Sequence, residues 1–287
     1  PIAHDNLMKV ALLYAQNCDG LVLSVPKNKS IAGEGIAHEG VHSTKLGLKG
    51  IPALAEELQI VRDLFLLEYT GGKLHIPTIS SAKSVDLIKE AKKNGLQVSC
   101  SVAAHHLTLT DNELHEFDSN FKTNPPLRTN ADCKALQKGV RTGVIDIITS
   151  DHDPIDIEYK KVEFSEAKDG TIGLESLFGA VNLVLPLEDF IESITSKPRA
   201  IFGLDPITIA EGKIAEISLQ AFILHQNHLR IKIRPVPAPN IKMKSNNCNA
   251  LVNNKAKAAE AKNKITVDKR PTFTFCFSVA VGLICCV

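Results

Sequence analysis

The sequence has no tryptophan and few aromatic residues of any kind. Aromatic side chains make up 5% of the 287 residues, and 33 Lys and Arg residues stand against 32 Asp and Glu residues. Proteins that bind single strands stack bases on aromatic side chains and attract the phosphates with excess positive charge. Neither feature is present, so we expect no nucleic-acid partner.

Several common motifs are also missing. The seven cysteines form no CxxC pair and no zinc-finger spacing, and their odd number fits a reduced, cytoplasmic protein. No GxGxxG or GxxxxGK[ST] follows a strand, so nucleotide binding has no support. The apolar run at 272–287 is shorter than the roughly 20 residues of a spanning helix. A buried strand, or sequence from outside the true reading frame, is preferred there over a tail anchor, and we expect no membrane partner.

Apolar strands alternate with helices from residue 6 to about 200. The patterns predict strands at 21–25, 74–79, 96–102 and 145–149, and helices at 6–16, 52–70, 84–93, 131–141, 173–185 and 187–195. Strands that are apolar along their whole length indicate a parallel sheet covered on both faces. A (β/α) barrel and an open doubly wound sheet both fit, and in both the site lies at the carboxyl ends of the strands.

The pattern changes after residue 203. Residues 206–219 alternate with period two around Gly212, which is typical of a β-hairpin. We therefore predict three parts: an α/β part at 1–202, a small β-region at 203–270 and an apolar tail at 271–287. The chain has no initiator Met and enters a helix at once, which we interpret as a start within a longer protein.

An ordered set of motifs along residues 1 to about 220 resembles one family. The set resembles the class I, allantoinase-like dihydroorotases of the amidohydrolase superfamily, and its members are GIAHEG (35–40), LGLKGIPALAEE (46–57), TGGKLHI (70–76), HHLTLTD (105–111), KTNPPLR (122–128), SDHDP (150–154) and GLE (173–175). The resemblance implies the C-terminal half, strands five to eight, of a TIM-type (β/α)₈ metal-dependent hydrolase barrel, with a remnant of a β-sandwich. It implies a zinc enzyme of pyrimidine biosynthesis that hydrolyses a small cyclic amide, interconverting dihydroorotate and carbamoyl aspartate.

The resemblance also assigns roles to individual residues. Asp151 corresponds to the strand-eight acid that binds metal and moves the proton, and Asn124 to a residue that contacts the pyrimidine ring. Ser24 stands at or next to the strand-five His ligand, and Thr78 at the strand-six His ligand. Ile155 replaces a substrate-binding His. Serine and threonine hydroxyls are poor zinc ligands beside imidazole, so we expect no zinc in this chain and impaired or absent catalysis.

Structural roles stand as alternatives for these polar residues. Asp151 can be a strand-end carboxylate bonded to nearby backbone, and Asn124 can fix the turn before Pro125. His105 and His106 follow a strand, where alternation would direct adjacent side chains to opposite faces and prevent chelation by both. His38 and His42 lie in a loop-like segment, and we expect no metal there.

Three functions remain open from the sequence. The chain is a non-catalytic homologue that associates with a protein such as aspartate transcarbamoylase, a hydrolase whose other half lies elsewhere, or a truncated product. An open half-barrel exposes strand edges, so a truncated product is predicted to be poorly soluble or to self-associate, for example as a homo-oligomer.

Overall fold

The core of the molecule is a parallel sheet of four strands. The computed structural model describes residues 4–208 and 210, together with short strands at 218–219, 233–236, 263–265 and 277–278. The strands of the main sheet lie in the order β1-β4-β5-β6 and are parallel throughout, with bounds Leu21–Leu23, Lys73–Ile76, Val98–Ala103 and Ile147–Thr149. Each strand lies beside the next one in sequence, without the reversal of a doubly wound sheet. The predicted parallel α/β sheet is confirmed, and its order is that of part of a barrel.

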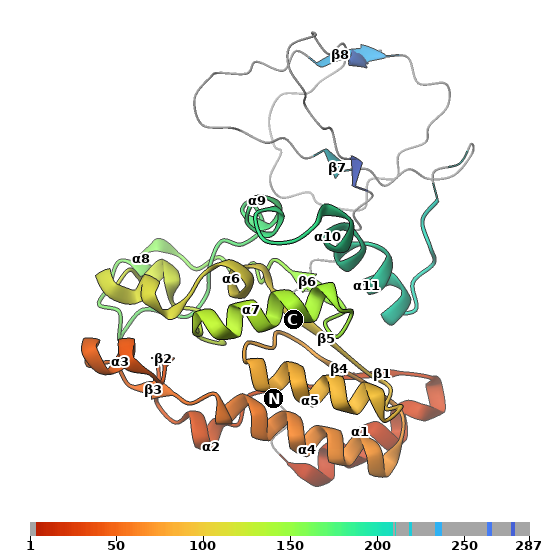
Figure 1. Ribbon diagram of the computed structural model, residues 1–287, viewed down its shortest axis with the longest axis horizontal. Coiled ribbons are helices and arrows are strands. Elements are labelled where there is room, and N and C mark those ends of the chain that lie inside the picture. The colour runs from red at the N-terminus through yellow and green to blue at the C-terminus, as the bar shows by residue number, and fades with distance from the viewer. Residues whose placement is uncertain are drawn as a thin grey trace. The chain divides into compact units, whose positions relative to one another are not determined.

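A row of helices follows the same order as the strands (Figure 1). Successive contacts join α1 to α4, α4 to α5, α5 to α7 and α7 to α10. Their bounds are Asp5–Ala15, Leu54–Thr70, Ala82–Lys93, Asn130–Arg141 and Leu187–Ile194. Local sequence sets their ends: Ser81 caps α5, Thr129 and Asp132 form a capping box on α7, and Gly71 ends α4 with φ of +73°.

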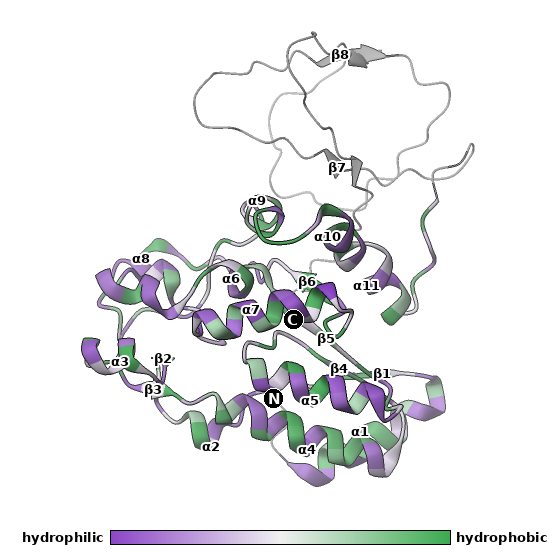
Figure 2. Cartoon of the chain, viewed as in Figure 1, coloured by the Kyte–Doolittle hydropathy of each residue, from purple (hydrophilic) through white to green (hydrophobic). Residues whose placement is uncertain are grey.

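The face of α4 that packs on the sheet is more polar than its sequence suggests. Figure 2 shows hydrophobic and hydrophilic residues alternating along α4. Glu56, Gln59 and Asp63 are buried on this helix, whereas the side chains of Leu58 and Phe65 are 44% and 68% exposed. The helix itself is confirmed, but two members of its apolar repeat point to solvent.

The connections at the carboxyl ends of the strands hold most of the short elements. Between β1 and α4 lie α2 (Lys29–Ala32), β2 (Ala37–His38), α3 (Val41–Leu46) and β3 (Gly50–Ile51), in a stretch expected to be a plain loop. Between β5 and α7 lie α6 (Ala104–Thr108) and two 3₁₀ turns, Asp111–Glu116 and Ser119–Phe121. After β6 come α8 (Ile157–Lys160), α9 (Leu177–Asn182) and α11 (Ser196–Ile201). The helix expected at 173–185 is therefore shorter, and α11 was not foreseen.

Two glycines allow β2 and β3 to lie side by side. A Cβ on Gly35 would meet the carbonyl oxygen of Gly50 at 2.6 Å, and a Cβ on Gly50 would meet the Cα of Glu39 at 2.7 Å. Any larger residue would push the paired segments apart. Gly35 of the GIAHEG motif and Gly50 of the LGLKGIPALAEE motif are thus required by this close approach.

The chain divides into two compact units, Pro1–Leu204 and Asp205–Val287. In the second unit, β7 (Ser218–Leu219) pairs antiparallel with β10 (Phe277–Ser278), and β8 (Ile233–Val236) with β9 (Asn263–Ile265). Most of the hairpin predicted at 206–219, and most of the apolar tail, lie outside the described residues. The division at 202 and 270 stays a prediction. Among the described residues, no helix is both long enough and apolar enough to cross a membrane.

Candidate functional site

Sheet register brings His105 and Asp151 together. Ala103 on β5 is paired with Thr149 on β6, and His105 and Asp151 each follow two residues later. The Nε2 atom of His105 lies 3.7 Å from Oδ2 of Asp151. This separation is too long for a hydrogen bond, and the buried Nε2 has no other hydrogen-bond partner. The strand ends therefore present an imidazole and a carboxylate that face each other without bonding.

The environment of Asp151 suits proton transfer. Burial, reinforced by the negative charge of Asp153, raises the pKa of Asp151 to about 6. Its backbone has a φ of +47°, in the left-handed region where non-glycine residues are uncommon. Strained backbone of this kind persists only where the surrounding structure holds it in place. Such positions concentrate at functional sites. Asp151 can thus hold or release a proton near neutral pH at a fixed position.

His105 and His106 lie on α6 and not on a strand. Their ring centroids are 4.4 Å apart, and Nε2 of His106 lies 3.1 Å from the carbonyl oxygen of Pro125. Burial and the neighbouring His106 hold the pKa of His105 well below its usual value, so its imidazole is neutral. The expectation that strand alternation separates the two rings is wrong, because the chain turns into a helix directly after Ala103.

Ser24 faces the helix layer. Its hydroxyl is buried and donates a 2.6 Å hydrogen bond to Oδ2 of Asp63 on α4. Side chains alternate along a strand, so Leu23 lies on the opposite face, and Leu23 and Val25 are about half exposed. Val25, the residue next to Ser24, therefore does not face the helix layer. Its side chain carries no group that can bind a metal.

Thr78 follows β4 in a strained conformation. Its φ is +51°, unusual for a β-branched residue, and its N–H donates a 3.0 Å hydrogen bond to Oγ of Ser101. Thr78 and Asp151 thus both have left-handed backbone just beyond a strand. The fold keeps the special geometry at both positions, but the one after β4 has no imidazole.

A buried polar network that was not predicted from the sequence supports the carboxyl end of β4. Glu56 on α4 accepts hydrogen bonds from the N–H groups of Ser80 and Ser81 and from the hydroxyls of Ser80 and Ser84. Nε of Arg128 donates to Ser80 at 3.0 Å, and its Nη2 lies 3.7 Å from Glu56. Spacing along the chain could not reveal these pairs, because they join segments 24 to 72 residues apart.

His38 belongs to the same network. Arg128 donates from Nη1 to Nδ1 of His38 at 3.0 Å and to the carbonyl oxygen of Ile51 at 3.2 Å. Burial, followed by the charge of Arg128, lowers the pKa of His38. His38 is therefore a structural acceptor. His42 lies on α3, outside these hydrogen bonds.

The remaining sequence-derived residues lie around the rim. Lys27 Nζ donates to Oδ1 of Asn124 at 3.1 Å, which brings the loop that carries Asn124 to the end of β1. Nδ1 of His152 accepts from the N–H of Leu174 at 3.3 Å. Ile155 packs against Gly170, where a Cβ would meet its Cγ1 at 2.8 Å. Asn124 is thus placed next to the strand ends, while His152 and Ile155 hold the following loop.

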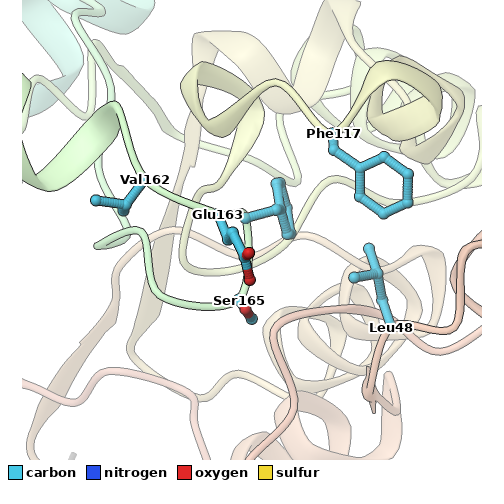
Figure 3. A pocket seen from close by; sticks show the side chains of 6 residues that line it. Leu48, Phe117, Val162, Glu163 and Ser165 are labelled. Carbon is cyan, nitrogen blue, oxygen red and sulfur yellow. The ribbon is translucent and has the colours of Figure 1, made fainter.

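A surface hollow of about 340 Å³ lies elsewhere among the loops (Figure 3). It is lined mainly by apolar side chains, with Glu163 and Ser165 beside them, and the lining residues are Leu48, Phe117, Val162, Glu163, Phe164 and Ser165. None of the residues to which the family resemblance assigns a role lines it. We therefore place the candidate site at the strand ends and not in this hollow.

The residues do not reproduce the zinc-ligand set that the resemblance implies. Within 4–208 and the other described positions, no three His, Cys, Asp or Glu side chains come together in a group that could hold a metal. Asp151 is in place, but Ser24 bonds to Asp63 and Thr78 offers a hydroxyl. These strand ends therefore do not fit a zinc ion held as the resemblance implies.

Comparison with solved structures shows which fold the chain shares. An L-hydantoinase (dihydropyrimidinase) from Arthrobacter aurescens matches with a TM-score of 0.62 and 22% identity, over 71% of this chain and 48% of the hydantoinase. A D-hydantoinase (dihydropyrimidinase) from Thermus sp. matches with a TM-score of 0.60 and 20% identity, over 71% and 48% of the two chains. At this identity the likeness concerns the fold alone, which corresponds to about half of a hydantoinase.

Sequence comparison identifies the relatives more closely. A dihydroorotase of Pelobacter propionicus is 41% identical over 224 residues, and one of Ruminiclostridium cellulolyticum is 41% identical over 223 residues. Each alignment covers 76% of this chain, and the chain spans about half the length of these relatives, 53% and 52%. No family model matches the chain. The chain is a homologue of the dihydroorotases of the amidohydrolase superfamily and corresponds to about half of one.

Proposed function

We propose that this chain is part of a cyclic-amide hydrolase of the dihydroorotase type and that, by itself, it does not hydrolyse dihydroorotate. The observation that carries the proposal is the contrast among the strand ends. Asp151 keeps its place after β6 with a pKa of about 6, whereas the ends of β1 and β4 offer Val25 and Thr78. Zinc would supply an activated water and polarise the carbonyl, and the residues for holding it are incomplete.

Asp151 and Asn124 could still contribute proton transfer and substrate contact to the hydrolysis of a cyclic amide. The carboxyl group of Asp151 accepts or donates a proton near neutral pH, as a general base must. Asn124 offers its side-chain amide at the rim, where a small cyclic amide would lie against it. Its present hydrogen bond with the half-buried Lys27 is exposed to solvent and can exchange for substrate at small cost.

The test measures zinc and hydrolysis on the full chain purified without added metal. We expect less than stoichiometric zinc, and dihydroorotate hydrolysis no faster than that of an Asp151→Asn variant. Stoichiometric zinc together with hydrolysis that the Asp151→Asn variant lacks would contradict the proposal.

One observation favours association with another protein as a second candidate. Leu54, Leu58, Phe65 and Tyr69 are exposed on α4 at 53%, 44%, 68% and 79%. These positions are spaced by four, seven and four residues, so they fall along one side of the helix, as an interaction face requires. Aspartate transcarbamoylase or a second copy of the chain is the proposed partner, and the cytoplasm the proposed location.

The test for association is size-exclusion chromatography of the chain alone and mixed with aspartate transcarbamoylase. Co-elution that a Phe65→Ser variant abolishes supports it. A monomer that stays separate from the transcarbamoylase excludes both partners.

A further inference from the structure

We propose that Lys27 is a specificity-determining residue of the candidate site and that, together with Asn124, it binds a carboxylate carried by the ring of a cyclic amide. The cyclic amide comes from the proposed function, on which this inference rests. The new element is its charge: an anionic ring is bound in preference to a neutral one. The family resemblance assigns no role to Lys27, and its contacts in the fold are what point to one.

The fold holds Lys27 and Asn124 together at the rim of the strand ends. Lys27 lies just beyond β1, and its Nζ donates a 3.1 Å hydrogen bond to Oδ1 of Asn124. Asn124 belongs to the connection between β5 and α7, so this bond joins loops that follow two strands separated by β4 in the sheet. Lys27 is half-buried and Asn124 is exposed. The pair is therefore fixed in position and still open to a ligand that arrives from solvent.

The hydrogen bond leaves only donors for a ligand. Lysine has N–H donors and no acceptor, so the amide atom of Asn124 that faces it is the oxygen, and the NH₂ group of Asn124 is directed elsewhere. Among the described residues, neither side chain has another hydrogen bond. When this exposed bond opens, the last ammonium donor also becomes available. A group of donors without acceptors selects a ligand that accepts, and an ionised carboxylate is acceptor-only.

Lys27 is the lysine of this region whose charge the fold uses least. Burial raises the pKa of Asp169, and the charges of Lys122, Lys27 and Lys160 oppose that rise, which places all three lysines near this carboxyl group. The ammonium groups of Lys122 and Lys160 donate to backbone carbonyl oxygens at 2.6–3.1 Å. Within the part of the chain that the structure describes, Lys27 bonds to Asn124 and forms no ion pair. Its positive charge thus remains available for an anion.

The exposure of these groups favours attraction over repulsion. Because Lys27 is half-buried, a carboxylate that contacts it interacts in a medium less polar than water. Asp169 is exposed, so water weakens its repulsion of an incoming anion. A ring without a carboxylate gains nothing from the ammonium charge. Lys27 can therefore distinguish an anionic cyclic amide from a neutral one, as a charged group does when one ligand pairs with it and another leaves it unpaired.

The experiment compares dihydroorotate with dihydrouracil, the same ring without the carboxylate, as ligands of the full chain. Ligand-detected NMR gives the dissociation constant of each. We expect dihydroorotate to bind about five- to tenfold more tightly, which lies between the effects of an exposed ion pair and a charge-assisted hydrogen bond. Lys27→Met should remove this preference and leave dihydrouracil binding unchanged. Lys27→Arg keeps the positive charge and should retain most of the preference.

Lys29→Met is the matched control. Lys29 is exposed on α2 and its loss changes the net charge by the same amount, so this variant reports effects of net charge alone. It should bind both rings as the unsubstituted chain does. Circular dichroism shows whether each variant is folded. If Lys27→Met fails to fold, NMR of the ¹⁵N-labelled unsubstituted chain should show that dihydroorotate shifts the amide signals of Lys27 and Asn124 more than dihydrouracil does.

Four results would overturn the carboxylate subsite. They are equal affinity for the two rings, absence of saturable dihydroorotate binding, a preference that folded Lys27→Met retains or that Lys29→Met loses equally, and amide shifts that leave Lys27 and Asn124 unaffected.

Binding is measured here without hydrolysis, so the outcome is separable from that of the proposed function. A chain that prefers dihydroorotate through Lys27 and does not hydrolyse it satisfies both proposals. Hydrolysis with stoichiometric zinc that Asp151→Asn abolishes, together with a preference that depends on Lys27, overturns the proposed function alone. Absence of hydrolysis and of any preference overturns the carboxylate subsite alone.

Discussion

The strand ends of β1 and β4 differ from those of β5 and β6 in how their polar side chains are bonded. Ser24 and Ser80 are buried and donate to carboxylates of α4, Asp63 and Glu56. After β5 and β6, His105 has an unbonded Nε2, and Asp151 faces it at 3.7 Å in a strained backbone conformation. The polar side chains at the ends of β1 and β4 are bonded within the fold. Those after β5 and β6 still have hydrogen-bonding capacity that the fold does not use.

This difference teaches which polar residues carry stability and which remain available for chemistry. A buried polar group with all its hydrogen bonds stabilises the fold, whereas one that lacks partners costs free energy and persists where another force retains it. Three substitutions test the distinction, in decreasing order of expected effect.

The first substitution, Glu56→Ala, tests the hydrogen-bonded network at the end of β4. It removes four hydrogen-bond acceptor contacts and leaves the buried Arg128 without its carboxylate. Breaking a buried charge pair from one side costs about 3–5 kcal/mol, so we expect a loss of that size in urea unfolding. Glu68→Ala, an exposed residue of the same helix, should change stability by less than about 0.5 kcal/mol. Equal losses in the two variants would show that the network adds nothing.

The second substitution, Ser24→Ala, tests the end of β1. Burial raises the pKa of Asp63, and the hydrogen bonds from Ser24 and Arg62 oppose that rise. Losing the Ser24 donor should destabilise the chain by about 1–3 kcal/mol in the same unfolding measurement, because the carboxylate stays buried. Leu23→Ala, on the neighbouring exposed position, is the control and should cost less.

The third substitution, Asp151→Asn, tests the end of β6, where the carboxyl group faces His105 without a hydrogen bond to it. The pKa of Asp151 is about 6 in the folded chain and about 4 in an unfolded one. Between these values the folded state binds more protons than the unfolded state, so its stability falls as pH rises from about 4 to 6. We expect Asp151→Asn to lack this decline and to be more stable than the unsubstituted chain at pH 7. Unfolding curves at pH 4 and pH 7 measure it, and an Asn variant that is less stable at pH 7 would contradict the comparison.

The sequence predicted the strands well because their signal is local. Apolar runs bounded by turns identified the four strands of the main sheet, and helical spacing identified α1, α4, α5, α7 and α10. The shorter elements, such as α6 and β2, have too few residues for a period to show. The family resemblance placed Asp151 at a strand end and assigned Asn124 to the substrate ring, but it could not say which side chains these residues meet.

The sequence by itself therefore determined the order of strands and helices, the position of Asp151 and the replacement of imidazole at the ends of β1 and β4. Only the tertiary structure decided that Ser24 bonds to Asp63, and that α4 turns Glu56, Gln59 and Asp63 inward while Phe65 faces solvent. The physical reason is that inward-facing polar groups of α4 find partners at strand ends far away in sequence, and those hydrogen bonds outweigh the apolar repeat. In the same way, the register of Ala103 with Thr149 places His105 opposite Asp151, because the strands bring together two residues that are 46 positions apart in the sequence.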